Sequence, residues 1–380
     1  MTAVARPAVL VLEDGRTFTG SSYGAEGETF GEAVFSTGMT GYQETLTDPS
    51  YHRQIVTMTA PHIGNTGMND EDDESRRIWV AGYVVRDPAR VPSSWRSRRS
   101  LDEALKAAGV VGISGVDTRA LTRHLRERGA MRAAISTETL EVEALLGRVL
   151  EQPPMAGADL AGDVTTGEPY VVPAEGDKRF TVVALDLGIK AMTPKRMAER
   201  GIEVHVLPVT STLEQVLERE PDGVFMSNGP GDPATTEHPT SLLKDLLERR
   251  VPYFGICFGN QVFGRALGLG TFKLKYGHRG INQPVLDRAT GTVEITAQNH
   301  GFAVDAPLEG TVETPYGVAE VSHVSLNDNV VEGLRLTGRD GRPLGFSVQY
   351  HPEAAPGPND ADPLFEDFYK MVEKRKAGKI

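Results

Sequence analysis

The sequence predicts an α/β protein: a C-terminal, mostly parallel sheet flanked by helices, preceded by an N-terminal domain of mixed α and β structure. Three observations support this prediction. In the C-terminal segment, residues 179–380, apolar strand-like runs alternate with helical segments as far as about residue 267, the pattern of a parallel sheet covered by helices, and the later part is mostly β. Residues 1–150 instead mix short strands, short helices and turn-rich loops. Residues 151–178 hold four prolines and four glycines, which is typical of a linker.

Turn and capping signals predict the elements of the N-terminal domain. The Asp14-Gly15 dipeptide separates two β-prone runs and is typical of a hairpin turn. Ser100 and Glu103 have the spacing of a capping box, which marks the start of a helix. The expected elements are a hairpin at 9–20, a strand at 55–59, and helices at 100–109, 118–128 and 137–150.

The C-terminal domain shows clearer alternation. Ser211 and Glu214 again have capping-box spacing, and the helix that they open is expected to end before Pro221. The last helix carries its apolar residues on one stripe, which predicts core packing. Strands are expected at 180–186, 204–209, 223–226, 251–256, 292–297 and 344–349, and helices at 189–200, 211–220, 241–250 and 363–376.

The central feature of this domain is the segment Val251–Leu267, VPYFGICFGNQVFGRAL. A β-prone run leads into a sharp turn at Cys257 and then into an apolar-periodic helix, which is the outline of a nucleophile elbow. Gly255 and Gly259 suit a crowded, strained turn because they have no Cβ. Free N–H groups at the helix start favour a thiolate. A lone cysteine is more often a buried structural residue, so the interpretation depends on partners.

A cysteine nucleophile needs a base, and the base needs an orienting group. His351 and Glu353 follow the strand at 344–349, and residues i and i+2 of an extended segment share a face. Pro352 biases His351 away from the helical conformation. The sequence therefore predicts a triad of Cys257, His351 and Glu353, although a surface histidine beside a solvated glutamate would have the same pattern.

Two glycine-containing segments suit an acyl-transfer site. Residues 227–233, SNGPGDP, follow a strand at its C-terminal end, where open α/β sheets bind ligands. Gly229 and Gly231 can offer N–H groups to a developing oxyanion. Residues 298–302, QNHGF, are expected to follow another strand and could bind an amide or an α-amino acid. Taken alone, each segment is equally consistent with an ordinary turn.

Composition and missing motifs exclude several classes of protein. The net charge of −12 is opposite to the basic face that nucleic-acid binding requires. No apolar run approaches the ~20 residues of a membrane span. A single cysteine excludes an internal disulfide and suits a reducing, cytoplasmic location. Since no phosphate-binding loop, HExxH motif or other metal-ligand spacing is present, neither ATP nor a metal is expected on this chain.

Four motifs together resemble those of class I, triad-type glutamine amidotransferases: GICFGNQ, the later HPE, SNGPGDP and QNHGF. The first domain narrows the resemblance. Its segments FSTGMTGYQETLTDPSYHRQIVTMTAPHIGNTG and DTRALTRHLRERGA are similar to the small, glutamine-hydrolysing chains of carbamoyl-phosphate synthase. The resemblance extends over nearly the whole chain and implies a class I amidotransferase-like fold for residues 179–380.

The resemblance implies a glutaminase in which Cys257 forms a glutamyl thioester, His351 moves the proton and Glu353 orients His351. The N–H groups of Gly229 and Phe258 would stabilise the oxyanion. It also implies that L-glutamine is held by Ser50 from the first domain and by Gly231, Gln261, Asn299, Gly301 and Phe302.

A partner is also implied. Ammonia would pass through a tunnel to a separate large subunit, in a heterodimer or a higher assembly. That subunit would carry ATP and a divalent metal and make carbamoyl phosphate from bicarbonate for arginine and pyrimidine synthesis. No cofactor is expected on this chain.

Two positions depart from the commonest family pattern, which has Leu and His in place of Phe258 and Asn260. Phe258 would act through its backbone, whereas Asn260 could change a polar contact at the helix start. Three alternatives remain: a class I amidotransferase subunit for anthranilate, GMP or CTP synthesis, a non-catalytic glutamine-binding scaffold, and a cysteine peptidase. The first has no reason to carry this N-terminal block, and the intact triad argues against the second.

Overall fold

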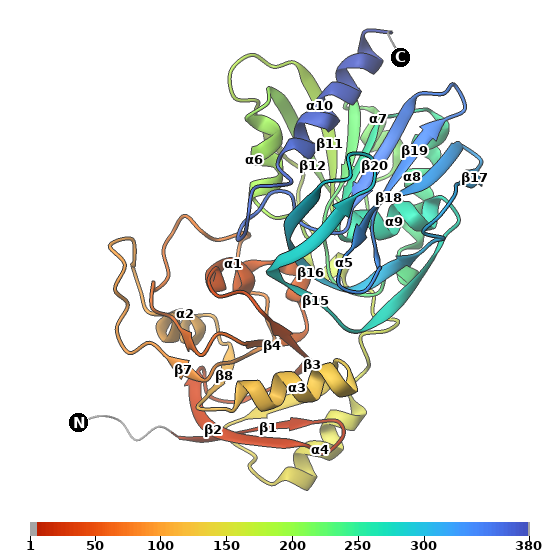
Figure 1. Ribbon diagram of the computed structural model, residues 1–380. Coiled ribbons are helices and arrows are strands. Elements are labelled where there is room, and N and C mark those ends of the chain that lie inside the picture. Colours follow the sequence, from red (N-terminus) through yellow and green to blue (C-terminus); the bar gives the residue numbers. More distant parts are fainter. Residues whose placement is uncertain (1–5, 379–380) are drawn as a thin grey trace. The chain divides into compact units, whose positions relative to one another are not determined.

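The computed structural model describes residues 6–378, so the first five residues of the N-terminal domain and the last two of the C-terminal domain lie outside the described part. The chain divides into two compact units (Figure 1). The first extends to Ala158 and includes Lys275–Gly280. The second comprises Asp159–Leu274 and the chain from Ile281 onward.

The first unit is built on a closed barrel with the strand order β1-β2-β8-β6-β4-β3-β9. Alternate residues of β1 face opposite sides: Leu10 packs in a cluster with Leu121 of α3, whereas Val9 packs with Leu145 of α4. The prediction of mixed α and β structure is confirmed. The strands are β1 (Pro7–Leu12), β2 (Thr17–Gly24), β3 (Glu28–Ser36), β4 (Gln54–Met58), β6 (Gly82–Val84), β8 (Val111–Ser114) and β9 (Met131–Ser136), with a separate pair of β5 (His62–Ile63) and β7 (Asp87–Pro88).

Local signals set the helix ends of this unit. The predicted capping box forms: the Glu103 N–H donates to the Ser100 hydroxyl at 3.2 Å, and the Ser100 N–H donates to the Glu103 carboxylate at 2.8 Å. The helix predicted from residue 137 starts later, because Thr137 instead continues the edge of β9 and donates its N–H to the Gly27 carbonyl. The helices are α1 (Tyr42–Thr47), the 3₁₀ turn η1 (Pro49–Tyr51), α2 (Leu101–Ala107), α3 (Thr118–Arg128) and α4 (Val142–Glu151).

The second unit is an 11-stranded sheet in the order β10-β12-β11-β13-β14-β20-β19-β18-β15-β16, with β17 beside β18. The strands from β12 to β20 in this order run parallel, as predicted, and antiparallel strands extend the sheet on both sides. The strands are β10 (Tyr170–Val172), β11 (Phe180–Asp186), β12 (Ile202–Pro208), β13 (Gly223–Met226), β14 (Tyr253–Ile256), β15 (Gly270–Asp287), β16 (Val293–Asp305), β17 (Val312–Thr314), β18 (Gly317–Ser325), β19 (Val331–Gly338) and β20 (Pro343–Val348).

Two apolar clusters lie on the two faces of the parallel strands. On β11, Leu185 packs with residues of α7, α8 and α9, whereas its neighbour Ala184 packs with residues of α6 and α10. The predicted stripe of the last helix, α10, lies in the second cluster. The helices are α5 (Ala161–Val164), α6 (Met192–Ala198), α7 (Leu213–Leu217), the 3₁₀ turn η2 (Pro233–Thr235), α8 (Glu237–Glu248), α9 (Phe258–Ala266) and α10 (Pro363–Lys376).

Two predictions for this unit were wrong in detail. Thr212 and Gln215 form the capping box of α7, one residue after the expected Ser211 and Glu214. Residues 298–302 do not follow a strand but lie inside β16, which continues to Asp305.

In the described part of the chain, no helix has the length and apolar character needed to cross a membrane.

Candidate active site

Cys257 sits in the sharp turn between β14 and α9. Its φ of 53° and ψ of −100° lie in a region that residues with a side chain rarely adopt, and such strain is concentrated at functional sites. The two glycines relieve crowding around the turn. A Cβ on Gly255 would lie 2.4 Å from the Tyr253 hydroxyl, and a Cβ on Gly259 would lie 2.2 Å from the Met226 carbonyl oxygen. The turn therefore places the thiol at the C-terminal edge of the parallel strands.

His351 follows β20, the strand next to β14 in the sheet. Its Nδ1 lies 2.7 Å from Oε1 of Glu353, whereas its Nε2 is buried and has no hydrogen-bond partner among residues 6–378. Burial acts to lower the pKa of His351, but the Glu353 carboxylate and the Cys257 sulfur outweigh it and raise this pKa to about 10. The site therefore favours an imidazolium beside the sulfur.

Glu353 is fully buried and also contacts a lysine. The Lys190 ammonium lies 3.1 Å from Glu353 Oε1 and donates to the Ala355 carbonyl at 2.5 Å. Burial alone would raise the pKa of Glu353, but Lys190 and His351 more than offset it and lower this pKa to about 2. The carboxylate is consequently held ionised, and it accepts a hydrogen bond from the Nδ1–H of His351.

The loop after β13 is fixed close to the turn that follows β11. The Ser227 hydroxyl accepts a hydrogen bond of 2.9 Å from the Leu187 N–H. Only glycine fits at position 229, because a Cβ there would lie 2.1 Å from the Leu187 carbonyl oxygen. Among the backbone hydrogen bonds that turns, loops and helix caps form within residues 6–378, none is donated by the N–H group of Gly229 or Phe258. Phe258 is the first residue of α9, where N–H groups have no acceptor within the helix.

The segment QNHGF brings β16 against the elbow. The Cys257 thiol lies 3.6 Å from the Asn299 carbonyl oxygen, with geometry for donation to it. Gln261, on the first turn of α9, donates from Nε2 to the Phe302 carbonyl at 2.8 Å. Gly301 lies between Asn299 and Phe302 in β16 and is partly exposed. A carbonyl of β16 thus lies beside the sulfur, and the first turn of α9 is bonded to the same strand.

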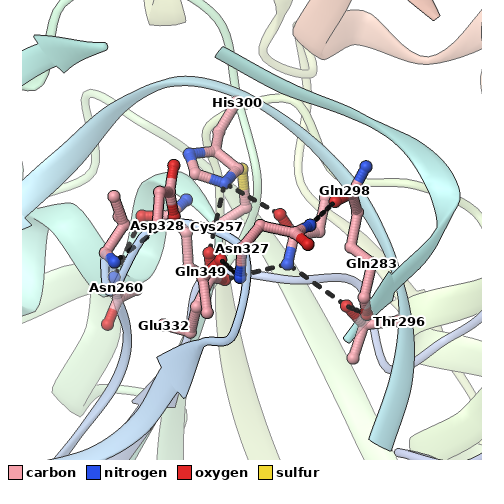
Figure 2. Close-up of polar contacts among 12 residues, drawn as sticks. Cys257, Asn260, Gln283, Thr296, Gln298, His300, Asn327, Asp328, Glu332 and Gln349 are labelled. Carbon is pink, nitrogen blue, oxygen red and sulfur yellow. Dashed lines mark hydrogen bonds and ion pairs between the residues drawn. The ribbon is translucent and has the colours of Figure 1, made fainter. Parts of the chain in front are cut away.

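A buried amide network supports the first turn of α9 (Figure 2). Asn260 donates from Nδ2 to Gln349 Oε1 at 3.1 Å and accepts from the Ser347 hydroxyl at 2.8 Å. The same Gln349 oxygen lies 3.2 Å from Gln261 Nε2. Asn260, one of the two departures from the family pattern, therefore links α9 to the strand that leads to the histidine.

His300 and Glu332 form a second part of this network (Figure 2). His300 Nδ1 lies 2.8 Å from the Phe302 carbonyl oxygen, and Nε2 lies 3.3 Å from Gln298 Oε1 and 3.8 Å from the Glu332 carboxylate. Both ring nitrogens therefore face oxygen atoms. The buried Glu332 carboxylate accepts from Gln298 Nε2 at 3.1 Å.

The remaining predicted residues lie in two different places. Gly231, with φ of 95°, belongs to the loop after β13. Ser50 belongs to the first unit, where it is buried in η1 and its N–H donates to Asp48 at 2.9 Å. Sequence reasoning missed Lys190 and Glu332. Lys190 follows β11 at the ligand-binding edge of the sheet, which could have marked it, whereas nothing local distinguishes Glu332.

Residues 183–371 match the family model described as "Glutamine amidotransferase class-I", the class of protein that this fold and site define. Residues 10–135 match "Carbamoyl-phosphate synthase small chain, CPSase domain". The chain belongs to the family of carbamoyl phosphate synthase small chains. It is 71% identical over 373 residues to the small chain of Streptomyces coelicolor, covering 98% of this chain and 97% of that one.

Other relatives agree. The Mycobacterium tuberculosis carbamoyl phosphate synthase small chain is 59% identical over 372 residues, covering 96% of this chain and 98% of that one. Among solved structures, a glutamine amidotransferase from Thermotoga maritima matches with a TM-score of 0.37 and 20% identity, over 52% of this chain and 85% of that chain. The family assignment rests on the full-length relatives, not on this structural match.

Proposed function

We propose that this chain is the glutaminase subunit of a carbamoyl-phosphate synthase and converts L-glutamine and water to glutamate and ammonia. The observation that carries the proposal is the strained Cys257 turn with the His351–Glu353 pair beside it. The N-terminal match supports carbamoyl phosphate synthesis, rather than anthranilate, GMP or CTP synthesis, as the use of the ammonia. The intact set of reactive groups favours an active enzyme over a glutamine-binding scaffold.

In this proposal the Cys257 sulfur attacks the side-chain amide carbon of glutamine. His351 gives the proton from Nε2 to the leaving nitrogen, and the C–N bond breaks to release ammonia and leave a glutamyl thioester. His351 then takes a proton from water, which attacks the thioester carbon and frees glutamate and the Cys257 sulfur. Glu353 orients the ring through Nδ1 and stabilises its charged form.

The oxyanion formed in both steps would accept from the N–H groups of Gly229 and Phe258. Such donors act strongly because they are fixed before charge develops. Glutamine itself would be held by the remaining residues of the site: Ser50, Gly231, Gln261, Asn299, Gly301 and Phe302. The contact of Gln261 with the Phe302 carbonyl supports a shared role for these last residues.

The partner in the proposal is the large subunit of the synthase, and the pair would form a heterodimer or a higher assembly in the cytoplasm. Ammonia would travel to it through a tunnel. ATP, bicarbonate and a divalent metal would be used on that subunit, so that this chain needs no cofactor. The carbamoyl phosphate would supply arginine and pyrimidine synthesis.

The test uses the complex of both chains. Cys257→Ser should abolish glutamine-dependent synthesis while leaving synthesis from added ammonia intact, since the large subunit is unchanged. His351→Asn should reduce the glutaminase rate roughly 10²-fold or more, as expected for loss of a general base. Full glutamine-dependent activity in Cys257→Ser would disprove the nucleophile assignment. If no large ATP-using chain binds, the synthase assignment fails instead.

A further inference from the structure

A tryptophan on the first unit is almost completely exposed. Trp95 has 90% of its surface accessible and Val91, in the same loop, has 76%, whereas Trp79, the other tryptophan of the chain, has 3%. A tryptophan buries ~150–250 Å² when it packs, so leaving it in water sacrifices much hydrophobic stabilisation. Residues 89–99, which we name the Trp95 loop, therefore present an apolar group that the described part of the chain does not cover.

The Trp95 loop is held in place rather than loosely attached. The Arg96 guanidinium contacts the Asp72 carboxylate at 2.6 Å and Glu71 at 3.0 Å. The Ser93 N–H donates to the Asn65 carbonyl at 2.8 Å. Both contacts tie the loop to the segment before it in the chain. Because the residues on either side of Trp95 are fixed, the indole is presented at low entropic cost to a partner.

The Trp95 loop carries four arginines, of which Arg96 and Arg99 are paired with acidic side chains of residues 70–72. Arg90 and Arg98 are exposed, and neither forms an ion pair within residues 6–378. The chain as a whole has a net charge of −12, so this local positive charge is opposite to the average surface. Tryptophan and arginine are the residues most enriched at the energetic centres of protein interfaces. A fitting partner surface has an apolar pocket with carboxylates at its edge.

We infer that the Trp95 loop is a docking anchor for the large subunit of the synthase, with Trp95 filling an apolar pocket and Arg90 and Arg98 facing carboxylates. The inference rests on the proposed function for the identity of the partner. A second copy of this chain fits less well. A two-fold contact centred on the loop would bring the arginines of both copies together, and like charges oppose association.

The experiment measures the dissociation constant between the purified small and large chains. Trp95→Ala should weaken binding roughly 30-fold or more, the effect expected for a central interface residue. Leu150→Ala is the matched control, since Leu150 is also apolar and half exposed on the first unit, and it should bind as the unchanged chain does. Arg90→Ala combined with Arg98→Ala should slow association and reduce its salt dependence.

A second readout separates docking from misfolding. The small chain labelled with 5-fluorotryptophan has two fluorine resonances, assigned with Trp95→Phe. Addition of unlabelled large chain should shift the Trp95 resonance and leave that of Trp79. Glutaminase activity of isolated Trp95→Ala should equal that of the unchanged chain, because Trp95 is not part of the reactive site.

The possible outcomes are distinct. Equal binding of Trp95→Ala and the unchanged chain, or an unmoved Trp95 resonance in the complex, overturns the docking inference and leaves the proposed function standing. Failure of the unchanged chain to bind the large chain overturns both. Self-association of the small chain that Trp95→Ala abolishes would assign the loop to a contact between copies and overturn the inference.

Discussion

Replacing Lys190 by methionine tests whether a buried lysine keeps the Glu353 carboxylate ionised. Methionine has similar length and no charge, so the substitution removes the ion pair with little change in volume. Lys190 and Glu353 have 3% and 0% of their surfaces exposed, so water cannot take over the role of the lost ammonium. We expect both the free energy of unfolding and the glutaminase rate to fall.

The geometry gives the size of the effect. At the 3.1 Å between Lys190 Nζ and Glu353 Oε1, two unit charges attract by ~5 kcal/mol at an effective dielectric constant of ~20. The lowering of the Glu353 pKa from 4.5 to about 2 corresponds to about 3 kcal/mol and includes the contribution of His351. Removing one partner of a buried pair typically costs ~3–5 kcal/mol, so a loss of about 3 kcal/mol is expected.

The sign of the pH dependence follows from the lowered pKa. A carboxylate with a lowered pKa contributes its full stabilisation at pH values above its ordinary pKa of 4.5. The fold loses that contribution as the pH falls through the lowered pKa of about 2. The difference between Lys190→Met and the unchanged chain should therefore be constant near neutral pH and shrink only below that ordinary value.

Urea unfolding at neutral pH measures this difference, and exposed Lys195→Met serves as the control, with an expected change within ~0.5 kcal/mol. A double variant that also carries Glu353→Gln should be more stable than the sum of the single changes predicts, because no charge is then left unpaired. A Lys190→Met chain as stable as the Lys195→Met chain would refute this account of the pair.

Two other substitutions test the turn and the base. Gly259→Ala should remove glutaminase activity and destabilise the second unit by more than ~2 kcal/mol, since its Cβ would lie 2.2 Å from the Met226 carbonyl oxygen. Gly270→Ala is the control and should be tolerated, because the nearest atom to its added Cβ lies at 3.7 Å. Calorimetry measures the stability of both variants, and ammonia release measures their activity. Glu353→Gln should move the alkaline limb of the kcat/KM profile to lower pH, because the carboxylate that raises the pKa of His351 to about 10 is gone; superimposable profiles would contradict the assigned cause.

Much of the reactive centre was predictable because its signals are local. The glycines around Cys257 and the i, i+2 spacing of His351 and Glu353 each follow from backbone geometry over a few residues. The parallel strands were equally predictable from the sequence, since each is a short apolar run between helices. The 2.7 Å contact between His351 and Glu353 forms across a turn, in which the Ala354 N–H donates to the His351 carbonyl, and not along the extended segment that was predicted.

What the sequence did not disclose depends on contacts between distant segments. Lys190 reaches Glu353 only because β11 and the segment after β20 end at the same edge of the sheet. Glu332 looks like any charged residue of a strand until β19 is placed beside β20. The closure of the first unit into a barrel depends on the pairing of β2 with β8, which no local signal specifies.

The adjacency of β14 and β20 fixes the separation between nucleophile and base in an unusually robust way. Cys257 follows one strand and His351 follows the other, and the Cys257 N–H donates to the Val348 carbonyl at 2.8 Å. Their spacing is thus set by the ~4.8 Å repeat between neighbouring strands. The chain between α9 and β20 forms the antiparallel extension of the sheet beyond β20. Changes in its length away from residues 298–302 would leave that spacing unchanged, because the spacing depends on the pairing of β14 with β20.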